Sequence, residues 1–205
     1  RFQDNEGIEL LAVVSTGILD RVDGTFVAGS DSSLELWEET TEPLLPNRSR
    51  YVLPRNRSAD QASNLRIGGM GRALVSPQEK RLYFTSATAP VVFSFELQTR
   101  QWVFDGENPL VLYDAQRENT LHHGWIDSQG ILYVTSFNRD ELYLVDTQCD
   151  ALLGEPISLG VSDELLEGPH GIAVWEREEE SVAYFMTTLS NTLGSLRFAK
   201  ENTDE

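Results

Sequence analysis

The sequence predicts an all-β fold built from repeats, and three observations support this prediction. Short runs of β-branched and aromatic residues recur along the 205-residue chain, and turn-forming residues bound each run. A common pattern of strands and turns recurs four times. No stretch sustains a helical period, and residues 163–167 have room for one helical turn at most.

Each repeat begins with a glycine and a short apolar strand. A polar turn leads to a second strand that starts with an aromatic residue, and a hairpin leads to a third strand. The leading aromatic residues are Phe26, Tyr83, Tyr133 and Tyr184, which lie 57, 50 and 51 residues apart. The four units therefore extend over residues 17–54, 71–113, 124–160 and 171–205.

A fourth strand is expected in the first three units, at residues 50–53, 109–113 and 156–159. The last unit ends in charged residues, whereas residues 8–14 form a spare apolar run before the first unit. A β-propeller closes its ring in this way, and closure leaves only short strand edges exposed. The sequence predicts a single four-bladed propeller domain in which residues 8–14 close the last blade. A part of a larger, six-bladed propeller is the alternative.

Composition excludes some classes of partner. Lys and Arg number 16 and Asp and Glu number 33, which gives a formal net charge of −17. This surface repels phosphate backbones and anionic lipid, so neither nucleic acid nor a membrane is an expected partner. A small-molecule ligand is expected, and a protein partner stays open. The single cysteine, Cys149, rules out an internal disulfide but leaves both a secreted and a cytoplasmic location open.

The three histidines stand where innermost strands begin. His123 and His170 occupy equivalent repeat positions, directly before a glycine, and His122 is adjacent to the first of them. Innermost propeller strands start at one mouth of the axial channel, so equivalent side chains are aimed at a shared cavity. An imidazole there can act as a general base or bind a metal. We predict His123 and His170 to be catalytic, although a histidine in a Pro-His-Gly turn can also simply cap its loop.

Further residues are expected near the same mouth. Arg72 follows a glycine on an innermost strand, and a cation inside an apolar blade needs a partner, so it is predicted to face the channel and stabilise negative charge. Turn chemistry is the alternative role for the polar hairpin residues, and core packing is the alternative for the tryptophan. The predicted substrate-binding residues are His122, Trp125, Asn138, Arg139 and Asp140.

The third and fourth units carry a family resemblance. The segments YVTS at 133–136, ELYLVDT at 141–147 and GPHGIAV at 168–174 resemble YVTN-type propeller repeats. Related blades occur in the lactonase and gluconolactonase-like families, NHL-repeat proteins, streptogramin B lyases and Yellow proteins. The resemblance implies a propeller and, in the lyases, a histidine base with a divalent metal at the channel mouth. Which residues of this chain would hold a metal stays unknown.

Two classes of function follow from these sequence features. The first is an enzyme that acts on a small organic molecule at the channel mouth, by hydrolase or lactonase, lyase, or isomerase or cyclase chemistry with a histidine acid/base. The second is a non-catalytic propeller that binds a ligand or a protein. Function resides in sites placed on folds, so the fold class cannot choose between the two. The confinement of the histidines to one end favours the enzyme.

Overall fold

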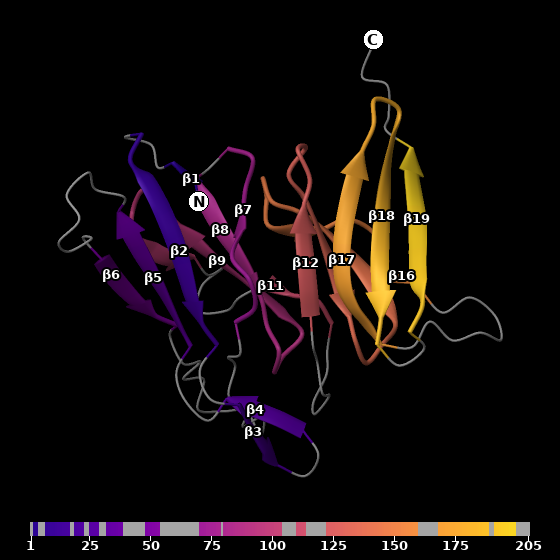
Figure 1. The fold of residues 1–205 in the computed structure, drawn as a ribbon, viewed down its shortest axis with the longest axis horizontal. Helices are drawn as coiled ribbons and strands as arrows, with labels where there is room; N and C mark the ends of the chain where they lie inside the picture. Colours follow the sequence, from indigo (N-terminus) through magenta and orange to yellow (C-terminus); the bar gives the residue numbers. More distant parts are fainter. Residues whose placement is uncertain are drawn as a thin grey trace. The chain divides into compact units, whose positions relative to one another are not determined.

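The computed structural model describes most of the chain. Its described residues are 2–3, 7–16, 19–22, 25–28, 32–38, 48–53, 70–78, 80–103, 110–113, 122–159, 168–188 and 191–199. The chain divides into two compact units, Arg1–Thr120 and Leu121–Glu205, and each is described by itself. All described elements are strands and all strand pairs are antiparallel, which confirms the predicted all-β class (Figure 1).

The first sheet contains four strands in the order β1-β2-β5-β6. They are β1 (Phe2–Gln3), β2 (Glu9–Ser15), β5 (Ser33–Glu38) and β6 (Arg48–Val52). Strand β2 holds most of residues 8–14, the segment predicted to close the last blade. It lies between β1 and β5 and pairs with β5 from Leu10 to Ser15. The prediction of N-terminal closure is therefore corrected, because both edges of β2 are occupied within the first sheet.

The first repeat also differs from its predicted boundaries. Strands β3 (Leu19–Val22) and β4 (Thr25–Ala28) form a separate two-stranded hairpin between β2 and β5 in the chain. The sequence pattern assigns these segments to the first two strands of the blade. Strand β2 takes that place because its alternating side chains bury Leu10 against the core of the sheet.

The second sheet follows the predicted repeat. It contains β7 (Leu74–Val75), β8 (Arg81–Thr85), β9 (Val91–Glu96), β10 (Gln101–Val103) and β11 (Leu110–Val111), and both β10 and β11 pair with β9. Five of the six residues of β9 are buried, as expected of a strand covered on both faces. The core of the first unit joins the first and second sheets around Leu34, Phe84, Phe93 and Phe95.

The second unit contains two sheets. The third sheet consists of β12 (His122–Ile126), β13 (Ile131–Ser136), β14 (Glu141–Asp146), β15 (Ala151–Leu152) and β16 (Ile157–Ser158). The last sheet consists of β17 (Pro169–Glu176), β18 (Glu180–Thr187) and β19 (Leu193–Ala199), in that order (Figure 1). The predicted fourth strands at 50–53, 109–113 and 156–159 correspond to β6, β11 and β16.

The two sheets of the second unit pack against each other through apolar side chains. Tyr133 and Leu142 of the third sheet and Val174, Ala183 and Phe185 of the last sheet form one buried cluster. Burial of such side chains stabilises the fold by about 1.5–3 kcal/mol each. This packing fixes β12 next to β17, so the starts of the two innermost strands of the unit come together.

A buried aspartate fixes the turn between β12 and β13. The Oδ1 atom of Asp127 accepts hydrogen bonds from the backbone N–H groups of Gln129 and Ile131, at 3.0 and 2.8 Å, and Oδ2 accepts one from the Tyr133 hydroxyl at 3.1 Å. Burial, and then the carboxylate of Asp127, raise the pKa of Tyr133 well above its ordinary value, so its hydroxyl stays a donor. The turn therefore holds its strands in register, and the buried carboxylate of Asp127 has hydrogen-bond donors for both of its oxygen atoms.

Candidate functional site

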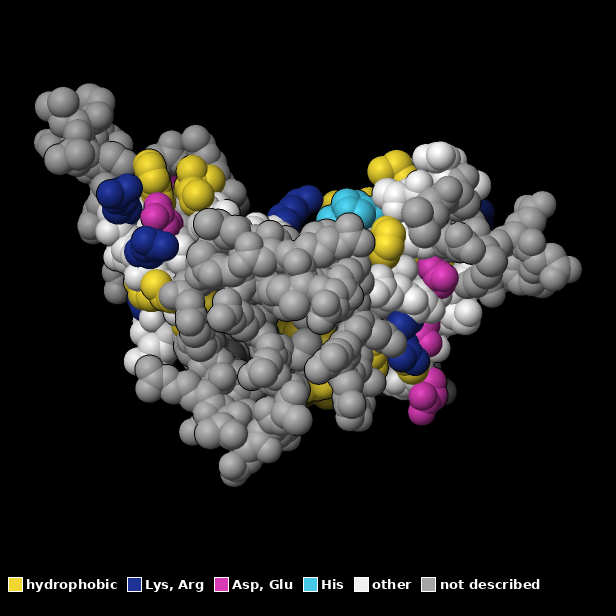
Figure 2. All heavy atoms as spheres, turned by 90° about the horizontal axis from the view of Figure 1, so that it is seen from below, with side chains coloured by type: hydrophobic (Ala, Val, Ile, Leu, Met, Phe, Trp, Pro, Cys, Tyr) yellow, Lys and Arg dark blue, Asp and Glu magenta, His cyan; other side chains and the backbone are white. Residues whose placement is uncertain are grey.

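The two histidines at equivalent repeat positions are in contact. His123 is the second residue of β12 and His170 is the second residue of β17. Their ring centroids lie 4.2 Å apart, with the ring planes inclined by 42°. Both side chains are half-buried, and histidine atoms are visible at the molecular surface in Figure 2. The repeat pattern predicted that these two residues meet, and the structure brings them together; their catalytic role stays a prediction.

An aromatic ring and a glycine shape the space beside the pair. The ring of Phe137 approaches that of His170 edge-on, with centroids 6.5 Å apart and an interplanar angle of 87°. Gly168 has φ of +71°, and a Cβ atom there would lie 2.7 Å from Cε2 of Phe137. A larger residue would therefore be strained and would also displace the ring. Sequence reasoning missed Phe137 and Gly168, although Gly168 opens the Gly-Pro-His triplet and Phe137 directly precedes the hairpin.

Asp140 connects the β13–β14 hairpin, through hydrogen bonds, to the residue that precedes β17. Its Oδ1 atom accepts a hydrogen bond from the N–H of Gly168 at 2.8 Å, and its carbonyl oxygen accepts one from the N–H of Leu159 at 2.7 Å. Asp140 itself has φ of +51°, a conformation that Asp adopts more readily than most residues. Because Gly168 stands two residues before His170, Asp140 is a positioning residue for the histidine pair.

Hydrogen bonds also fix backbone carbonyl groups at and near the two histidines. The Thr135 hydroxyl donates a hydrogen bond to the carbonyl oxygen of His123 at 3.4 Å. The backbone N–H of Thr188 donates to the carbonyl oxygen of Gly168 at 3.1 Å, and its hydroxyl donates to the same oxygen at 3.3 Å. Neighbouring strands thus fix the backbone on both sides of the pair, which limits how far the two rings can separate.

The electrostatics of the pair keep one imidazole neutral. Burial first, and then the neighbouring charge of His170, lower the pKa of His123 from 6.5 to about 4. His123 is consequently unprotonated at neutral pH. A neutral imidazole offers one ring nitrogen as a hydrogen-bond acceptor and the other as a donor. The site can therefore accept a proton, or bind a ligand that presents both a donor and an acceptor.

The other predicted site residues of the second unit differ in exposure and in the contacts that they make. Arg139 is exposed and its Nε atom forms an ion pair with Oε2 of Glu141 at 2.8 Å, rather than with Asp140. Asn138 is exposed in the same turn. Trp125 is partly buried and packs against the core cluster of the second unit, as the packing alternative expected.

Two predicted site residues stay untested. The side chain of His122 lies outside the described residues. Arg72 is exposed and precedes β7 in the first unit. Its predicted role towards the channel therefore stays a prediction, like the role of His122.

The described residues do not complete a metal site. No group of three or more His, Cys, Asp or Glu side chains among them is placed to hold a metal ion. The histidine pair supplies two imidazoles, whereas a catalytic zinc site has three protein ligands.

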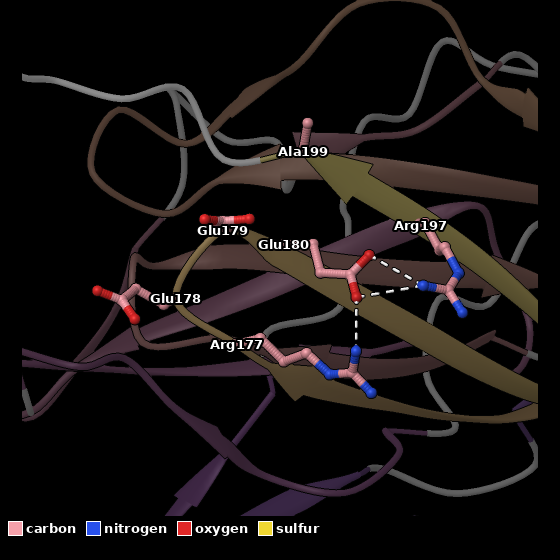
Figure 3. Close-up of a pocket in the computed structure, with 6 residues that line it drawn as sticks. All are labelled: Arg177, Glu178, Glu179, Glu180, Arg197 and Ala199. Carbon is pink, nitrogen blue, oxygen red and sulfur yellow. Dashed lines mark hydrogen bonds and ion pairs between the residues drawn. The ribbon is translucent and has the colours of Figure 1, made fainter.

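A concave region lies at the end of the last sheet that is away from His170. A shallow depression of about 580 Å³ is lined by the turn between β17 and β18 and by the end of β19. Figure 3 shows Glu180 between Arg177 and Arg197, with ion pairs at 2.9 and 3.2 Å, while Glu178 points away from them. These exposed pairs contribute little to stability and neutralise one another. Residues 177–179 of this turn are exposed to solvent.

Comparisons with known proteins place the chain among β-propellers. No protein-family model matches it, and no curated protein matches it in sequence. One similar structure is virginiamycin B lyase from Staphylococcus aureus, a catalytically inactive variant with quinupristin. It is 9% identical to this chain, and the match covers 87% of this chain and 54% of the lyase chain, with a TM-score of 0.51. The WD40 repeats of RRP9 have 12% identity over 83% and 48% of the two chains, with a TM-score of 0.51.

The likenesses to virginiamycin B lyase and to the WD40 repeats of RRP9 confirm the propeller fold. A streptogramin B lyase structure also matches, with 15% identity over 97% of this chain and 57% of its own, at a TM-score of 0.49. The chain spans about half the length of these solved structures. The fold is thus shared with an enzyme and with a WD40 repeat protein. Among the described residues, no helix is long and apolar enough to cross a membrane.

Proposed function

We propose that the chain is a β-propeller enzyme that moves a proton on a small organic substrate, with His123 and His170 as its acid/base pair. The observation that carries the proposal is the contact between the two rings, whose centroids are 4.2 Å apart. Two half-buried imidazoles that come from equivalent positions of successive repeats form a shared polar spot between apolar sheets. Histidine is the most frequent general acid or base in enzymes.

The low pKa of His123 assigns the direction of proton transfer. At neutral pH its free ring nitrogen can accept a proton from the substrate, and a pKa of about 4 makes His123 a weaker base than an ordinary imidazole but its imidazolium a stronger acid. It therefore returns the proton readily, to a leaving group or to another carbon of the substrate. This sequence suits lyase, isomerase or cyclase chemistry, and it also suits hydrolysis of a lactone when water is the proton donor.

The remaining predicted residues enter the proposal in supporting roles. Asp140 and Gly168 position His170, as described above. Arg72 is the proposed cation for developing negative charge, because Arg139 is engaged by Glu141. His122, Trp125 and Asn138 stay proposed contacts of the substrate. The virginiamycin B lyase supports the choice of histidine, since its variant with a histidine replaced by alanine is catalytically inactive.

The competing proposal is a propeller that binds without catalysis. The likeness to the WD40 repeats of RRP9, at the same TM-score, favours it. In that case the imidazoles would hold a small-molecule ligand through hydrogen bonds. The net charge of −17 disfavours nucleic acid and anionic membranes as partners in either case.

A substrate screen separates the two proposals. The full chain is incubated with quinupristin and with a panel of simple lactones, and the products are identified by mass spectrometry. An enzyme is expected to convert at least one probe, with turnover reduced about 100-fold or more in His123→Gln and His170→Gln. Arg197→Gln serves as the control, because Arg197 lies at the exposed edge of the shallow depression. Binding of a probe without turnover, lost in the histidine variants, would favour the second proposal.

A further inference from the structure

Phe137 is a half-buried aromatic residue outside the apolar cluster that joins the two sheets of the second unit. It directly follows β13, as the first residue of the turn that leads to β14. Its ring lies beside the ring of His170 and over the backbone of Gly168. The packing of Phe137 is therefore directed at the histidine pair and at the residues that lead into β17.

The repeat shows that this hairpin position does not require an aromatic residue. In each unit the residue four places after the leading tyrosine opens the hairpin between the second and third strands. This residue is Ala87 in the second sheet, Phe137 in the third and Thr188 in the last. A methyl group or a small hydroxyl-bearing side chain is enough for two of the three hairpins. The size of the phenylalanine ring thus serves something other than the turn.

Gly168 leaves the room that the ring occupies. A Cβ atom at this position would lie 2.7 Å from Cε2 and 3.0 Å from Cζ of Phe137, which is closer than side-chain atoms pack. Gly168 also has φ of +71°, which residues with a side chain adopt only with strain. The carboxylate of Asp140 accepts the N–H of this glycine at 2.8 Å. The backbone before β17 is therefore shaped around the ring of Phe137 and keeps it next to His170.

The charges around the pair favour an uncharged ligand. Burial and the neighbouring His170 lower the pKa of His123, and no carboxylate among the described residues is a cause of that shift. In the adjoining hairpin, Arg139 forms an ion pair with Glu141. The chain as a whole has a net charge of −17, which repels anions. A neutral molecule therefore meets less resistance at this site than an anion does.

We propose that Phe137 determines the specificity of the site, and that the substrate is an uncharged molecule with an alkyl or aryl group beside its reacting atom. This inference rests on the acid/base function proposed for the histidine pair. A substrate atom within hydrogen-bond reach of an imidazole, about 3 Å, is close enough for its substituent to contact the neighbouring ring of Phe137. Contact with an aromatic ring removes the apolar substituent from water and favours it over hydrogen.

Three probes separate the effects of the apolar group and of charge. The probes are γ-butyrolactone, γ-phenyl-γ-butyrolactone and the anion 4-phenylbutyrate. Their affinities for the full chain at pH 7.5 are measured from the NMR signals of the imidazoles of His123 and His170. The phenyl lactone is expected to bind about tenfold more tightly than the parent lactone. The anion, which has the aromatic ring and also a charge, is expected to bind about tenfold more weakly than the phenyl lactone.

Variants then assign the preference to the ring. Phe137→Ala, which has the residue of the second sheet at this position, should reduce affinity for the phenyl lactone about tenfold and leave affinity for the parent lactone unchanged. Phe137→Leu keeps an apolar side chain and should retain most of the preference. Met186→Ala is the matched control, because Met186 is 58% exposed and follows Phe185, which points into the buried cluster, so Met186 points to the other side of the sheet.

Each outcome decides between the proposals. Equal affinities of the two lactones for the wild type would overturn the proposed specificity, as would a failure of either lactone to bind. An equal loss for both lactones in Phe137→Ala would overturn it too, because that result indicates a structural role. Turnover without the preference would refute the role of Phe137 and leave the acid/base function standing. The preference without turnover of any probe would confirm the role of Phe137 and count against the acid/base function.

Discussion

The lowered pKa of His123 predicts a defined dependence of stability on pH. Its pKa falls from 6.5 in the unfolded chain to about 4 in the fold, because of burial first and of His170 second. Above pH 6.5 both states carry a neutral imidazole and the residue has no effect. Between pH 6.5 and 4 the unfolded chain binds a proton that the folded chain does not. Stability is therefore lost as the pH falls through this window.

The size of this loss of unfolding free energy follows from the shift in the pKa of His123. A difference of 2.5 between the two pKa values corresponds to at most about 3.4 kcal/mol of unfolding free energy. His123 is only half-buried, and solvent screening reduces the expected loss to about 1–2 kcal/mol by pH 4. Replacement by a residue that does not titrate should remove this loss and leave the contributions of the carboxylates unchanged.

The assay is urea unfolding of the wild type and of His123→Gln at pH 7.5, 6.5, 5.5 and 4.5. The difference in unfolding free energy between the two proteins should shift in favour of the variant by about 1–2 kcal/mol as the pH falls. His170→Gln serves as a partial control, because it removes the charge of the neighbour and leaves the burial of His123. Parallel curves for the wild type and His123→Gln would refute the reasoning, as would an NMR titration that places the pKa of His123 near 6.5.

The remaining predictions concern the turns and glycines that hold the site. Asp127→Ala should lower the unfolding free energy by about 2–4 kcal/mol in urea denaturation, because two backbone N–H groups and a buried hydroxyl lose their acceptor. Gly168→Ala should cost about 1–3 kcal/mol more than Gly154→Ala, since both have positive φ but only the first meets a ring, and equal costs would contradict this. Asp140→Ala should reduce turnover and also lower the melting temperature, because the N–H of Gly168 loses its acceptor and alanine is strained at a φ of +51°.

The likeness to propellers covers most of this chain but only about half of each matching structure. The histidine pair itself lies in the second unit, between β12 and β17.

The amino-acid sequence by itself determined the strands and much of their order. Runs rich in β-branched and aromatic residues between turn formers identified β8, β9, β13, β14, β18 and β19, because these preferences are local. The equivalence of His123 and His170 was also readable, since a repeat places matching residues at matching ends of neighbouring strands. Four repeats, with leading aromatic residues 57, 50 and 51 residues apart, predicted a propeller.

Only the tertiary structure decided which strands pair and what surrounds each histidine. The run at 8–14 is apolar enough to join any sheet, and its partner β5 was set by packing between residues distant in the sequence. The contact of Gly168 with Phe137 and the tie from Asp140 link segments about 30 residues apart, so no local pattern reveals them. The pKa of His123 depends on burial and on the charge of His170, and both exist only once β12 and β17 have packed together.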